Sequence, residues 1–243
     1  MMWWSGLGLT ELLIGIAVRV FIVLICLPIH EFAHGFAAYK LGDPTAKNNG
    51  RLTLNPIAHI DWIGAACIML VGFGWAKPVP VNPFHFKNQK HRKAGMALTA
   101  FAGPLSNLLL SFIGVLVLRG FACVKFLPEN VDLIYHATYI LFYVIAINLS
   151  LAIFNLIPIP PLDGSRIIAG VLPDKVSRFF EKYQMVISLV FIVVIFGGML
   201  DGPLSFLQHK AIGGLYGAAD WIYNLIGLEG NWNEPIKIMI GLY

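Results

Sequence analysis

The 243-residue sequence has the composition of a membrane protein, which excludes an ordinary soluble domain. Hydrophobic residues make up 58% of the chain and charged residues 12%, against roughly 25% charged residues in soluble domains. The net charge of +4 comes without a basic and aromatic surface pattern, so we expect no nucleic-acid partner.

The first predicted helix covers residues 11–40 and carries the most informative motif of the chain. No Lys or Arg precedes it in residues 1–10, so we expect no secretory signal peptide, which needs a basic start. Its apolar pattern is interrupted by Arg19 and by the sequence His-Glu-Phe-Ala-His at residues 30–34. The Gly and Pro of the following sequence LGDP predict the end of the helix.

The rest of the chain alternates between loops and apolar helices. Residues 49–56 predict a loop with one short strand, and three prolines keep residues 75–88 extended. Residues 203–228 fit either a span or a helix lying in the membrane interface. Further membrane spans are expected at about residues 94–118, 133–156 and 183–200.

The basic residues indicate that one apolar stretch, residues 57–73, does not cross the membrane. Twelve of the 17 Lys and Arg residues fall in three loops, at residues 40–56, 75–93 and 163–182. Basic residues mark the cytoplasmic side, and a crossing at 57–73 would put the first two loops on opposite sides. We therefore expect a re-entrant or shallow segment there, buried against protein.

These elements together predict an all-α polytopic membrane protein. We expect about five to six transmembrane helices, a short membrane-associated β element and a re-entrant segment. The chain is expected to form a single integral-membrane domain over residues 1–243. Its core lies at about 11–200, followed by a C-terminal helix and tail at 201–243.

The two histidines of residues 30–34 are spaced as metal ligands on a helix. At i and i+4, His30 and His34 lie on one face about one turn apart, so both can reach the same ion. Glu31 is rotated by about 100° from His30, a position that suits a base acting on metal-bound water. Ionisable groups inside a span are costly and usually functional. The alternative is that these polar side chains are satisfied by neighbouring helices or line a pore.

Zinc catalysis normally needs three protein ligands, with the fourth position left to water. No histidine lies six residues beyond His34, where Lys40 stands, and the next glutamate after Glu31, Glu129, falls in a loop outside the spans. The best candidate for the third ligand is Asp163. Prolines that end the span expected at residues 133–156 hold the chain before Asp163 extended, so its carboxylate can turn back towards the helices. The pair Asp163-Gly164 also fits an ordinary turn.

These motifs resemble the site-2 protease family of intramembrane zinc metalloproteases, peptidase family M50. The resemblance includes HEFAH at residues 30–34, NLIPIPPLDG at 155–164, GRLTLNP at 50–56, GWAKPVPV at 74–81 and AGPLSN at 102–107. It is to the compact prokaryotic type, since these 243 residues have no room for a PDZ or CBS domain.

The resemblance implies one Zn²⁺ bound by His30, His34 and Asp163, with Glu31 as the general base. It also implies transmembrane protein substrates that are cut within or near the lipid bilayer. The expected location is the cell membrane, as a multi-pass protein of a prokaryotic plasma membrane with the active site towards the cytoplasmic side.

Other polar residues are candidates for contact with a substrate. Asn107 and Asn155 could hydrogen-bond the substrate backbone or a developing oxyanion; the alternative is helix packing through small and polar side chains. The proline-alternating residues 77–81 could pair with an unwound substrate strand, or form a stiff linker. The three cysteines and the other five histidines lack metal-ligand spacing.

Two further functions fit part of this pattern. A divalent-metal transporter could line an ion path with His and Asp side chains, and a catalytically inactive relative could bind membrane proteins. A transporter has no reason to place Glu31 beside His30, and an inactive relative is expected to have lost the base or a ligand. We therefore expect a zinc metalloprotease.

Overall fold

The computed structural model describes residues 8–72, 74–123 and 131–227 of the chain. All regular structure within these residues is helical, which confirms the predicted all-α class. The chain forms two compact units, one of Met1–Asn107 with Phe154–Leu200 and one of Leu108–Ile153 with Asp201–Tyr243. A single domain over residues 1–243 stays a prediction.

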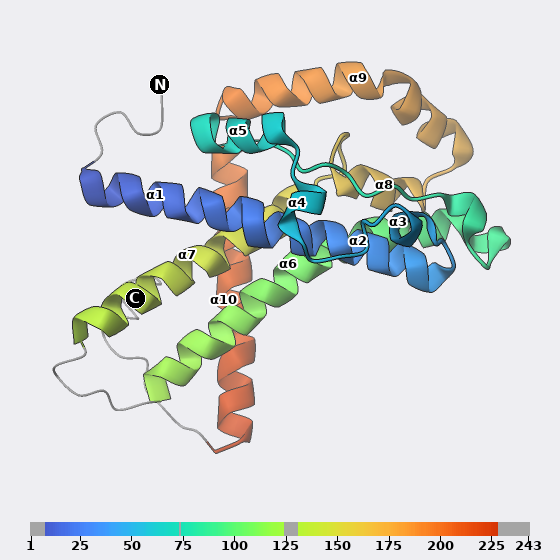
Figure 1. Cartoon of the computed structure of the whole chain (residues 1–243). Coiled ribbons are helices and arrows are strands. Elements are labelled where there is room, and N and C mark those ends of the chain that lie inside the picture. Colours follow the sequence, from blue (N-terminus) through green and yellow to red (C-terminus); the bar gives the residue numbers. More distant parts are fainter. Residues whose placement is uncertain (1–7, 73, 124–130, 228–243) are drawn as a thin grey trace. The chain divides into compact units, whose positions relative to one another are not determined.

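The first span is one continuous helical rod, as predicted. It consists of α1 (Leu9–Phe21), the π-helical turn η1 (Ile22–Cys26) and α2 (Leu27–Leu41), which follow one another in Figure 1. The rod ends at Gly42, whose φ of 111° lies in the left-handed region that glycine tolerates. The short helix α3 (Thr45–Asn48) follows directly.

Residues 57–73 do not form a crossing helix. After α4 (Pro56–His59), the apolar helix α5 (Trp62–Val71) has 10 residues, or about 15 Å, half the thickness of the hydrocarbon core. The chain then turns back on α5, because a Cβ on Gly64 would lie 2.1 Å from the Trp75 carbonyl oxygen. The Lys77 N–H donates to the His59 carbonyl at 2.9 Å. The two ends of this stretch therefore lie side by side, as a re-entrant segment requires; residue 73 lies outside the described residues.

The strand expected within residues 49–56 does not form. The Arg51 N–H donates to the Ala46 carbonyl at 2.8 Å, and the Thr53 carbonyl accepts from the His59 ring at 2.8 Å. The Asn55 side chain caps α4 by accepting from the Ile57 N–H at 3.1 Å. Local turns and caps thus use the backbone groups that a strand would have offered to a partner.

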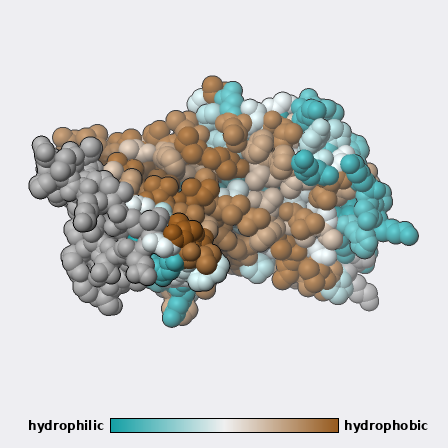
Figure 2. Space-filling view, turned by 90° about the horizontal axis from the view of Figure 1, so that it is seen from below, coloured by the Kyte–Doolittle hydropathy of each residue, from teal (hydrophilic) through white to brown (hydrophobic). Residues whose placement is uncertain are grey.

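Four helical stretches of the described residues are long and apolar enough to cross a membrane, fewer than the five to six expected. They are Leu12–Leu41, Gln89–Phe121, Ala137–Asn155 and Val176–Phe196. Hydrophobic side chains, drawn brown, cover much of the face in Figure 2, as expected of a surface that contacts lipid. The remaining elements are η2 (Pro83–His85), η3 (Gln89–His91), α6 (Arg92–Cys123), α7 (Val131–Asn155), α8 (Asp163–Ala169), α9 (Asp174–Phe196) and α10 (Asp201–Leu225).

Helix α10 has 25 residues but is not among these four stretches. It packs within the second unit, where Tyr216 and Ala219 join a core with side chains of α6 and α7. Its Asp220 accepts from the Arg119 Nε at 2.7 Å, and the Arg119 side chain is buried. Part of the polar content of α10 is therefore paired inside the helical unit.

Candidate metal centre

The sequence motif at residues 30–34 places two imidazoles on one face of α2. Their rings meet at a centroid distance of 4.6 Å and nearly at right angles. Both side chains are largely buried, with exposed fractions of 7% for His30 and 12% for His34. The two Nε2 atoms lie 3.0 Å apart and point towards the same place.

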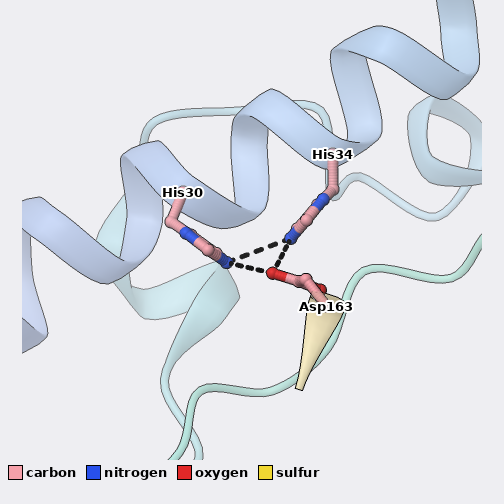
Figure 3. A group of neighbouring side chains, drawn as sticks. All are labelled: His30, His34 and Asp163. Atoms are coloured by element: carbon pink, nitrogen blue, oxygen red, sulfur yellow. Dashed lines mark hydrogen bonds and ion pairs between the residues drawn. The ribbon is translucent and has the colours of Figure 1, made fainter. Parts of the chain in front are cut away.

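Asp163 brings its carboxylate to the same place from a distant part of the chain. It is the first residue of α8, and its Oδ2 lies 3.0 Å from the His30 Nε2 and 3.2 Å from the His34 Nε2. Figure 3 shows the three side chains converging. A Cβ on Gly164 would lie 2.3 Å from the Ile157 carbonyl oxygen, so only glycine allows this approach. The pair Asp163-Gly164 thus begins a helix packed on the preceding turn.

The donor atoms of His30, His34 and Asp163 fit a zinc ion. They form a triangle with sides of 3.0, 3.0 and 3.2 Å. Zinc bonds of about 2.0–2.1 Å in a tetrahedron separate neighbouring ligand atoms by about 3.3 Å. Within the described residues, this is the one group of three or more His, Cys, Asp or Glu side chains arranged to hold a metal.

A backbone carbonyl sets the tautomer of His34. The carbonyl of Thr99 can only accept, so the His34 Nδ1, 2.7 Å away, carries the proton. Once His34 is neutral, its Nε2 carries no proton and can give its lone pair to a metal ion, as a ligand must. The buried Nδ1 of His30 has no hydrogen-bond partner within the described residues.

The charge of Asp163 also suits the binding of a metal cation. Burial alone would raise the pKa of this carboxyl group. Hydrogen bonds and charge interactions with His30 and His34 outweigh burial and hold the pKa of Asp163 well below its usual range. Asp163 is therefore ionised at neutral pH and offers a negative oxygen beside two imidazole nitrogens.

Helix α6 closes one side of the cluster through Gly103. A Cβ at this position would lie 2.4 Å from the His34 Nε2 and 2.6 Å from the His30 Cε1. The residues against which Gly103 packs closely are therefore the two imidazoles. Asn107 lies one turn further along α6 and is fully buried.

Glu31 lies beside the cluster and is held by another part of the chain. Its Oε2 accepts from the Val79 N–H at 2.9 Å. Nothing in the sequence pattern predicted this contact, because it joins α2 to the proline-rich loop through a backbone group. Asn155 lies at the C-terminal end of α7 and is partly buried. Its proposed contact with substrate stays a prediction.

The chain is similar to several bacterial proteins along most of its length. YwhC of Bacillus subtilis (strain 168), a zinc metalloprotease by name, is 40% identical over 207 residues, covering 82% of this chain and 90% of YwhC. Rip2 of Mycobacterium tuberculosis (strain ATCC 25618 / H37Rv) bears the same description. It is 26% identical over 211 residues, covering 85% of this chain and 73% of Rip2.

A sequence model of peptidase family M50 matches residues 131–196, which include Asp163. No solved structure matches the chain. The similarity to YwhC covers 82% of this chain and 90% of YwhC, and YwhC and Rip2 are both named as zinc metalloproteases. The chain therefore belongs to peptidase family M50, the site-2 protease family of zinc metalloproteases.

Proposed function

We propose that this membrane metalloprotease cuts transmembrane protein substrates within or near the bilayer. In this proposal His30, His34 and Asp163 hold one Zn²⁺ and Glu31 is the general base. The observation that carries it is the convergence of the three donor atoms, from α2 and α8, within 3.2 Å of one another. A carboxylate on the residue next to His30 completes the set of groups that peptide hydrolysis needs.

Bound zinc supplies a Lewis acid that polarises the scissile carbonyl and lowers the pKa of a water ligand to about 7. Glu31 removes a proton from the attacking water as the new C–O bond forms. It then delivers that proton to the nitrogen of the leaving amine as the C–N bond breaks. The Thr99 carbonyl keeps His34 in the tautomer that leaves its Nε2 free to bind the metal.

The membrane setting supports the proposed substrate class. Glu31 is eight residues before Tyr39, near the end of α2, and eight residues of helix span about 12 Å. Apolar residues dominate the span around the cluster. Basic side chains are exposed beyond the end of α2 and before α6, at Lys47, Lys87 and Lys90. This pattern supports a multi-pass protein of the cell membrane whose active site faces the cytoplasm.

Asn107 and Asn155 are proposed to contact the substrate backbone or the developing oxyanion. The amide group of Asn107 is fully buried, and neither of its polar atoms has a partner within the described residues. A buried amide without partners is costly. A polar group brought in by water or substrate would remove that cost, which supports a role for Asn107 beyond packing.

The test compares wild-type protein with Glu31→Gln in detergent or proteoliposomes. Zinc content is measured by mass spectrometry, and cleavage is followed on single-span substrates. We expect unchanged zinc and a cleavage rate lower by about 10²- to 10⁴-fold, the usual contribution of a general base. Glu181→Gln, which changes an exposed side chain of α9, is the matched control and is expected to cleave normally.

Equal cleavage by wild-type protein and Glu31→Gln would reject the proposal. A soluble peptide with the same cleavage sequence tests the substrate class, because an intramembrane protease should prefer the single-span protein. Zinc flux into liposomes that survives Glu31→Gln would instead support a transporter.

A further inference from the structure

The proline-rich loop that follows α5 is fastened at both ends by hydrogen bonds to its backbone. At one end, the Lys77 N–H donates to the His59 carbonyl at 2.9 Å, and the Lys77 carbonyl accepts from the Arg51 Nη2 at 2.5 Å. At the other end, the Asn82 N–H donates to the Asp43 Oδ2 at 2.6 Å. Arg51 and Asp43 are both buried, and both hydrogen-bond to the backbone of this loop.

Between these ends, the sequence Pro78-Val79-Pro80 offers one N–H in three residues, because proline has none. That N–H belongs to Val79 and donates to the Glu31 Oε2. Val79 is buried against α2, where a Cβ on Gly35 would lie 3.3 Å from the Val79 Cγ1. Gly35 lies one helical turn after Glu31, so the loop lies against the face of α2 that carries the carboxylate.

The bond to Val79 fixes the orientation of the Glu31 carboxylate. It is the one hydrogen bond of the Glu31 carboxylate within the described residues, and it engages Oε2 and leaves Oε1 for a proton. A general base must be held within hydrogen-bond reach of the proton that it removes.

We propose that the backbone N–H of Val79 is a positioning group that orients the Glu31 carboxylate for proton transfer. Arg51 and Asp43 keep the loop in place for this purpose. The inference rests on the proposed role of Glu31 as the base. It also assigns a role to the GRLTLNP sequence at residues 50–56, because Arg51 of this sequence holds the loop through the Lys77 carbonyl. It also means that the Val79 N–H does not pair with a substrate strand.

The first test measures the hydrogen bond directly by amide hydrogen exchange and mass spectrometry. In a proteolytic peptide that spans residues 78–80, Val79 carries the one exchangeable amide of these three residues. We expect it to exchange at least about 10-fold faster in Glu31→Ala than in wild type, because the acceptor is lost. Glu31→Gln keeps an acceptor oxygen and should exchange within about threefold of wild type. Equal exchange in wild type and Glu31→Ala would overturn the inference.

The second test removes the donor by Val79→Pro and compares it with Val79→Ala, which keeps the N–H. We expect the kcat of Val79→Pro to be about 10- to 100-fold below that of Val79→Ala, with KM and bound zinc changed less than about threefold. Val81→Pro is the matched control, because its N–H makes no hydrogen bond within the described residues. It adds the same ring to the same loop and should cleave within about threefold of wild type.

The outcomes separate the two proposals. A Val79→Pro kcat equal to or above that of Val79→Ala, with Glu31→Gln inactive, overturns the positioning role and leaves the base in place. An active Glu31→Gln rejects the base itself. If Val79→Pro does not fold or loses zinc, the exchange comparison decides, because it uses an unchanged loop.

Discussion

Replacement of Gly103 by alanine tests the metal centre through its packing. The new methyl carbon would lie 2.4 Å from the His34 Nε2, 2.5 Å from the His34 Cε1 and 2.6 Å from the His30 Cε1. Ordinary van der Waals contact begins at 3.4 Å, so both rings must move by about 1 Å or α6 must retreat. Gly103→Ala therefore perturbs both proposed histidine ligands without removing a donor atom.

The size of the effect follows from the cost of overpacking, about 1–3 kcal/mol for an extra carbon in a tightly packed site. If that cost falls on the zinc-bound state, zinc affinity decreases by about 5- to 150-fold. The assay is competition for zinc with a chromophoric chelator on purified protein, combined with the thermal stability of the metal-free form. We expect weaker zinc binding and a modest loss of stability.

Gly114→Ala on the same helix is the matched control. A Cβ there would lie 2.6 Å from the Ile145 Cγ1, a similar overlap with an aliphatic side chain in the second unit. Gly114→Ala should lower thermal stability and leave zinc affinity within about threefold of wild type. Zinc binding by Gly103→Ala at wild-type strength, or equal zinc loss in both variants, would refute the reasoning that Gly103 packs against two zinc ligands.

Three further changes test other charged groups. Asp163→Asn removes the anionic donor and should weaken zinc binding by at least about 10-fold by the same competition assay; unchanged affinity would exclude Asp163 as a ligand. Burial alone would raise the pKa of Asp43, but hydrogen bonds from Thr45, the Asn82 N–H and His85 hold that pKa below its ordinary value. The ionised form therefore stabilises the fold above the ordinary pKa of about 3.9, and this contribution is lost as pH falls through the lowered value. Asp43→Asn should lower Tm at pH 7, with a difference from wild type that shrinks on acidification; a constant difference across pH would contradict this. Asp220→Asn weakens the ion pair between the buried Arg119 and the partly exposed Asp220 and should cost about 0.5–1.5 kcal/mol in a denaturation assay, with zinc content unchanged; loss of zinc would show that the pair does more than stabilise its own unit.

Features that depend on local pattern were predicted from the sequence. The i and i+4 spacing of His30 and His34 places them on one face of a helix in any context, and Gly42 ended that helix where expected. The distribution of basic residues correctly indicated that residues 57–73 turn back. The pairing of Asp163 with the histidines, a contact between distant segments, was also anticipated, because a zinc site needs a third donor and the motif around Asp163 resembles that of the site-2 protease family.

Other contacts between distant segments were not predicted. The short strand expected in residues 49–56 failed because the Thr53 carbonyl and the Asn55 side chain are used by α4. The Val79 N–H and the Thr99 carbonyl are backbone groups, and their partners Glu31 and His34 cannot be read from a residue-type pattern. The sequence hinted at the contact of Val79 only through the prolines on both sides of it, which leave the Val79 N–H as the one backbone donor of residues 78–80.

The re-entrant turn at residues 57–73 brings the proline-rich loop to Glu31, the proposed general base. Because the chain returns along α5, Lys77 meets His59, and the loop that follows reaches α2. A crossing helix would place Val79 on the other side of the hydrocarbon core, which is about 30 Å thick. Glu31 would then lose the hydrogen bond from the Val79 N–H. The same turn keeps the basic residues of both flanking loops on one side. The non-crossing segment is therefore a condition for the proposed position of the base, and any change that straightens it should abolish cleavage while the two histidines remain together on α2.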